Sequence, residues 1–168
     1  MDLKQMFLTQ LGQESAATRR TLERVSERHN DWKPHEKSMT LGYLAGLVAS
    51  IPSWAEFMIE RDELDLNDPS ADRFKARAVE SRIELLKMLD DGLLKSRKAL
   101  ERTSDEHLQR AWRFIRNGQI LFDAPQYVAR ANLCFCHMAH HRGPRTVSLR
   151  LNAASVPAIY GSSAGKMH

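Results

Sequence analysis

Apolar residues recur at intervals of three and four along most of this chain, with charged or polar residues between them. Such spacing places the apolar side chains on one face of a helix. We therefore expect four helices, over residues 3–25, 38–61, 74–100 and 123–151. Ser38 or Thr40 is expected to cap the second helix, and Pro52 is expected to kink or restart it because proline disturbs a helix interior.

The segments between the expected helices carry turn signals. Residues 62–72 are polar and acidic, which is typical of a loop. Residues 111–122 form two short extended runs around Asn117-Gly118, which predicts a small hairpin or an open loop. Asp123 is expected to cap the last helix, with Pro125 near the start of that helix.

These elements predict one architecture, since the sequence has no repeat of fixed period. Long amphipathic helices bury their apolar faces against one another, and four of them form a bundle. We expect an all-α fold, a single four-helix bundle domain over residues 1–168 with a short irregular or hairpin segment near 110–122.

Composition and charge narrow the class of protein. The 168 residues are 27% charged and 42% hydrophobic, which is ordinary for a soluble globular domain. The net charge is only +4, and basic residues alternate with acidic ones, as in the segment 60–63, so nucleic-acid binding is disfavoured. No apolar run approaches the roughly 20 residues of a membrane span, and the start lacks a signal-peptide pattern, so no membrane association and a cytoplasmic location are expected.

Side chains that could react or bind a metal are concentrated in residues 134–143, which hold both cysteines and three of the seven histidines. Cys134 and Cys136 are separated by one residue and would point apart on a helix, so they cannot bridge within the chain. His137 and His141 are one helical turn apart and face the same way, which is a metal-ligand spacing. His140 is rotated by about 100° from His141 and is expected to face a neighbouring helix or solvent.

Four sequence segments together resemble the DinB-like superfamily of bacterial four-helix bundles. They are Trp32 to Gly46, His137 to Gly143, Leu149 to Leu151 and Val156 to Gly161. The resemblance covers nearly the whole chain in order. It implies a homodimeric bundle that binds one divalent metal, often zinc or nickel, through one histidine of the second helix and two of the fourth.

Matching the chain to that pattern places His137 and His141 at the fourth-helix pair and Leu47 at the position of the third histidine. A leucine has no lone pair, and a catalytic zinc site normally uses three protein ligands, so metal binding is expected to be weak or absent. Cys134 could replace the missing ligand, although it lies about 10 Å from His141 along a straight helix. The alternative, which we favour, is that Cys134 is a small buried apolar residue.

Other residues near the expected site allow more than one interpretation. Pro144 stands where the family usually has glutamine, and it predicts a kink beside the histidines. His35 and Glu36 could fold over the mouth of the site, but an exposed polar pair is favoured. The tryptophans at element boundaries could line a pocket, but such residues more often belong to the core or an interface: Trp32, Trp54 and Trp112.

Two functions follow from the resemblance. The favoured one is a degenerate family member with an incomplete histidine triad, which acts as a binding or stress-response protein for an unknown small molecule. The alternative is a metal-dependent thiol transferase or isomerase, in which a metal held by His137 and His141 would lower the pKa of a bound thiol. The sequence identifies neither a catalytic residue nor a cofactor-binding residue beyond these two histidines.

Overall fold

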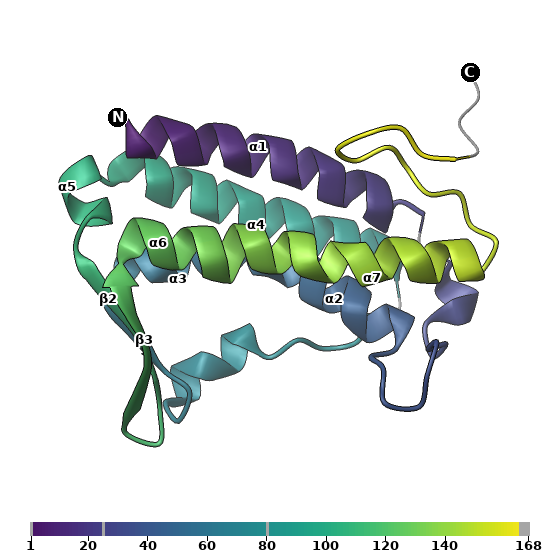
Figure 1. Cartoon of the computed structure of the whole chain (residues 1–168), viewed down its shortest axis with the longest axis horizontal. Coiled ribbons are helices and arrows are strands. Elements are labelled where there is room, and N and C mark those ends of the chain that lie inside the picture. The colour runs from purple at the N-terminus through teal and green to yellow at the C-terminus, as the bar shows by residue number, and fades with distance from the viewer. Residues whose placement is uncertain (1, 25, 80, 165–168) are drawn as a thin grey trace.

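Four long helical segments pack side by side in the computed structural model, which describes residues 2–24, 26–79 and 81–164 (Figure 1). The helices and helical turns are α1 (Leu3–Leu22), η1 (Glu27–His29), α2 (Leu41–Ser50), η2 (Ile51–Ser53), α3 (Trp54–Glu60), η3 (Pro69–Phe74), α4 (Arg82–Arg102), α5 (Asp105–Leu108), α6 (Gln126–Arg130), η4 (Ala131–Cys136) and α7 (His137–Leu151). Within the described residues, no helix combines the length and apolarity needed to cross a membrane. The predicted bundle is confirmed, and a small sheet is added to it.

The second helical segment begins and bends where the sequence predicts. The Thr40 hydroxyl caps α2 by accepting a hydrogen bond from the Tyr43 N–H at 3.3 Å. The 3-10 turn η2, which contains Pro52, then separates α2 from α3. A cap and a proline restart are local features, so the sequence alone identifies them.

The expected start of the third helix near residue 74 is wrong, because α4 begins at Arg82 after a cap by Ser81. Residues 76–79 instead form neither helix nor strand. This segment lies against α2 at Gly46, where an added Cβ would overlap the Arg77 carbonyl oxygen. The side chain of Val79, in the same segment, is buried beside Ala45 and Ala49 of α2.

A three-stranded sheet stands at one end of the bundle (Figure 1). Its strands are β1 (Glu63–Asp65), β2 (Ala111–Arg116) and β3 (Gln119–Pro125), in the order β1-β2-β3. The pair β2–β3 is the predicted hairpin, and Asn117 and Gly118 have φ values of 50° and 73°, as a tight type I′ turn requires. The parallel strand β1 lies in the segment expected to be a loop, and Asp123 lies in β3 instead of capping a helix.

The last helical rod is built from three consecutive segments. A short α6 leads into a π-helical stretch, η4, and then into α7. Pro144 lies inside α7 and is exposed, and α7 continues past it to Leu151. In the bundle α7 packs against α1 and α2, while α4 packs against α1, α2 and α3.

A buried arginine joins α7 to α1 and to the segment that follows α7. The Arg142 guanidinium, 1% exposed, donates hydrogen bonds to the Glu14 carboxylate at 2.6 Å and to the Thr18 hydroxyl at 3.0 Å. It also donates to the Tyr160 hydroxyl, which itself donates to Glu14 at 2.7 Å. Figure 1 shows the segment after α7 folding back beside the end of α1.

Removing the Glu14 carboxylate should destabilise the protein strongly, because it leaves the buried charge of Arg142 without a counter-ion. We expect Glu14→Ala to lower the free energy of unfolding by about 3 kcal/mol in urea denaturation. The control is Glu101→Ala, which removes an exposed pair with Arg97 and should cost less than about 1 kcal/mol. Similar losses in both variants would contradict the role given to Arg142.

The close passage of the chain at Gly46 gives a second stability prediction. Gly46→Ala should lower the free energy of unfolding by about 1–3 kcal/mol, because the added methyl overlaps the Arg77 carbonyl. Gly12→Ala is the matched change in open space on α1, and should raise that free energy by about 0.5–1 kcal/mol through better helix propensity. Thermal or urea unfolding of both variants measures the difference, and a gain in stability for Gly46→Ala would argue against the close approach of Arg77 to α2.

Candidate functional site

His137 and His141 lie on one face at the start of α7, as the sequence spacing predicts. Their ring centroids are 4.5 Å apart, and the His140 ring is 4.8 Å from that of His141. His137 and His141 are partly buried, whereas His140 is exposed. The structure therefore brings together two imidazoles with a third at their edge.

Both paired imidazoles are poorer bases than a free histidine. Burial, together with the neighbouring His137 and His140, lowers the pKa of His141 to about 4. Burial, together with His140, also lowers the pKa of His137. Near neutral pH both rings are therefore neutral, the form in which imidazole accepts a hydrogen bond or binds a metal.

The surroundings of this pair do not fit a three-histidine metal centre. Leu47 is buried on α2, which packs against α7, and it belongs to the same apolar cluster as Met138. Across residues 2–24, 26–79 and 81–164, no three His, Cys, Asp or Glu side chains gather closely enough to hold a metal ion. The residues that are present offer a metal two adjacent imidazoles.

Cys134 lies in the apolar core and not beside the histidine pair as a ligand. Its Sγ is 3.7 Å from the Met58 Sδ, and the residue is 2% exposed. Burial raises the pKa of the Cys134 thiol to about 12, against an opposing effect of Arg130. The thiolate that a metal would need is therefore strongly disfavoured there, as the buried-residue interpretation predicts.

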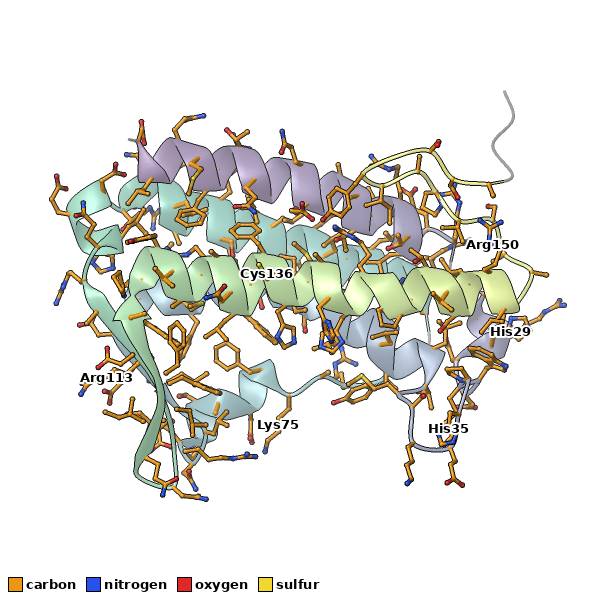
Figure 2. All side chains as sticks on the ribbon, viewed as in Figure 1. His29, His35, Lys75, Arg113, Cys136 and Arg150 are labelled. Atoms are coloured by element: carbon orange, nitrogen blue, oxygen red, sulfur yellow. The ribbon has the colours of Figure 1, made fainter. Side chains whose placement is uncertain are left out.

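The remaining residues considered from the sequence lie at the surface. Cys136 is exposed at the end of η4. His35 and Glu36 are exposed in the connection before α2, and Figure 2 shows His35 at the tip of that connection, well away from Cys136. They are an exposed polar pair and not a cover over the histidines.

Beside His137, an apolar pocket of about 240 Å³ separates the bundle from the sheet. Trp54 of α3 and Leu133 of η4 line it on the bundle side, and Trp112 of β2 and Phe74 of η3 line it on the other. Leu64 of strand β1 and Leu66, which follows that strand, add to its wall. His137 is the histidine among the lining residues, so the pocket and the histidine pair form one continuous site.

Two tryptophans in the pocket wall carry unpaired donors. The Trp54 ring packs edge-on against His137 at 5.2 Å and against Phe74 at 5.4 Å between centroids. The Nε1 atoms of Trp54 and Trp112 are shielded from solvent, and neither has a hydrogen-bond acceptor among the described residues. Unpaired buried donors are uncommon and costly, so both N–H groups call for an explanation.

The sequence offered only a faint signal for this pocket. Its walls come from segments that are far apart along the chain, and strand β1 was not expected at all. The tryptophans at element boundaries were the one available indication, since Trp54 and Trp112 both line the pocket. Trp32, by contrast, is not among the residues that line it.

Comparisons with known proteins identify the fold. No family model matches the sequence, and no curated protein matches it. Among solved structures, the chain is similar to a DinB-like protein from Bacillus cereus ATCC 10987, with a TM-score of 0.70 and 22% identity over 92% of this chain and 95% of that one. It is also similar to a DinB-like protein from Bacillus subtilis, with a TM-score of 0.66 and 19% identity over 94% of this chain and 99% of that one. The chain therefore has the DinB-like fold, as its sequence resemblance predicts.

Proposed function

We propose that this protein is a degenerate DinB-like protein that lacks a tight metal centre and works by binding a small molecule. The observation that carries the proposal is the burial of Leu47 in the apolar core, on the helix α2 that packs against α7. In the DinB-like pattern this is the position of the third histidine. A homodimer, which the resemblance implies, is part of the proposal.

The site has too few protein donor atoms to bind a metal ion tightly. A catalytic zinc site normally takes three protein ligands and keeps one position open. Here two imidazoles remain, and a hydrocarbon side chain occupies the third position, so a bound ion would depend on water for the rest of its coordination. The neutral imidazoles and the adjoining pocket remain suited to an uncharged ligand.

The paired imidazoles also support the alternative, a metal-dependent thiol transferase or isomerase. His137 and His141 keep the spacing at which two ring nitrogens can reach one ion. When bound, a divalent metal would lower the pKa of a thiol and so make it nucleophilic. Metal affinity separates this alternative from the proposal.

Titration of untagged, chelator-treated protein with zinc and nickel should show weak or no binding by calorimetry. Leu47→His should raise the affinity about 100- to 1,000-fold, because a four-ligand zinc site provides about 10–16 kcal/mol and one ligand about a quarter of it. The control is Leu41→His, another buried leucine of α2 nearly two turns earlier, which should leave the affinity unchanged.

Two outcomes of this titration would count against the proposal. Tight stoichiometric binding by the unmodified protein would favour the metal-dependent enzyme. A folded Leu47→His variant with no gain in affinity would show that position 47 does not stand opposite the two histidines. Circular dichroism of each variant establishes whether it is folded.

The burial of His141 predicts a pH dependence of stability. Its pKa is about 4 in the folded protein and 6.5 as a free side chain, so between these values the unfolded chain binds more protons. The free energy of unfolding should therefore fall as the pH drops from about 6.5 to 4, by less than about 1.4 kcal/mol per unit because the ring is partly exposed. His141→Gln should flatten this dependence, whereas His35→Gln, at an exposed position, should preserve it; an unchanged profile in His141→Gln would contradict the assignment.

A further inference from the structure

The pocket beside His137 has the size of a small aromatic molecule. Its volume is about 240 Å³. An apolar protein cavity of about 150 Å³ accommodates benzene, so this pocket has room for a benzene ring that carries a substituent. The size excludes most nucleotides and larger cofactors as fully enclosed ligands.

Its walls favour a flat, apolar ligand. Trp54 and Phe74 meet edge to face at 63°, and Trp112 and Phe114 are stacked at 11°. All four rings line the pocket. Aromatic walls at these angles offer both faces and edges to another ring, which is how aromatic groups pack most favourably.

The two unpaired indole N–H groups add a polar requirement. Trp112 is 1% exposed, yet its N–H has no acceptor among the described residues, and the same holds for the N–H of Trp54. Both Nε1 atoms are shielded from solvent, so a tryptophan ring must turn to bring its N–H to the pocket surface; pairing there with a ligand acceptor would relieve the cost of a buried unpaired donor. The pocket thus combines aromatic walls with donors that need an acceptor.

The lining also argues against a charged ligand. No Lys, Arg, Asp or Glu is among the residues that line the pocket. Burying a charge without a counter-charge is strongly unfavourable, so neither a carboxylate nor a phosphate suits it. A quaternary ammonium ion could use the aromatic faces, but it would leave both indole donors unpaired.

From these observations we infer that the pocket binds a small, uncharged aromatic molecule that carries a hydrogen-bond acceptor such as a carbonyl, which pairs with the N–H of Trp54 or Trp112. The inference rests on the proposed small-molecule function and specifies its ligand class. It requires no metal.

The test compares two probes of similar shape, acetophenone and ethylbenzene, of which only acetophenone has an acceptor. Each is titrated into 15N-labelled full-length protein in the presence of a chelator, and the three indole N–H signals are followed by NMR. Acetophenone should shift the signals of Trp54 and Trp112 saturably, with a dissociation constant of about 1 mM or tighter, while Trp32 serves as the internal control.

Variants then separate filling of the pocket from hydrogen bonding. Leu133→Trp should abolish binding of both probes by filling the pocket, whereas Leu94→Trp on the exposed face of α4 should have no effect. Trp54→Phe and Trp112→Phe each remove one donor. At least one of these variants should bind acetophenone about fivefold more weakly, while its affinity for ethylbenzene stays unchanged.

The titrations can support or overturn the inferred ligand class. Absence of a saturable shift with acetophenone would overturn the inference, and so would equal losses for the two probes in both Trp→Phe variants. Tighter binding of tetramethylammonium than of acetophenone would overturn it in favour of a cation cage. If Leu133→Trp does not fold, the titrations of the unmodified protein and of the Trp→Phe variants still decide. Because a chelator is present throughout, failure here is distinct from the discovery of a tight metal site.

Discussion

The constraint on which the rest of this structure depends is the long return of the chain between α3 and α4. Figure 1 shows that α4 runs in the same direction as α2 and α3, so the connection that begins at residue 61 must travel back along the bundle. On the way it supplies β1 to the sheet and Phe74 to the pocket wall, and it passes so close to α2 that only a glycine fits at position 46. This connection thus supplies one strand of the sheet and part of the pocket wall.

The histidine pair and the pocket meet at His137, so the site combines imidazole groups with an apolar cavity. A single turn of α7 offers two neutral imidazoles, and α2, which packs against α7, carries the buried Leu47. The polar groups left near the pocket are hydrogen-bonding groups without formal charge: an imidazole and two indole N–H groups. Such a set recognises the shape and the acceptor pattern of a ligand and not its charge.

Local chemistry explains what the sequence could predict. The three-and-four spacing identified the four helical segments, Thr40 identified a cap, and Asn117-Gly118 identified the hairpin turn. The sequence does not predict the late start of α4 because Phe74 and Val79 continue the helical spacing, whereas in the structure Phe74 ends the 3-10 helix η3 and Arg77 passes close to α2 at Gly46. Strand β1 was missed because its pairing with β2 is a long-range backbone interaction. The adjacency of His137 and His141 followed from spacing on one helix, whereas the pocket combines distant segments that no local pattern connects.

The contact of Tyr160 with Glu14 has a consequence for the order of folding. The two residues are separated by 146 positions in the chain, and both hold the same buried arginine. Nearly all of the chain must therefore leave the ribosome before the charge of Arg142 acquires its complete set of partners. The first helix is made early but gains its contact with Tyr160 late, and closing so long a loop is the kind of step that slows folding.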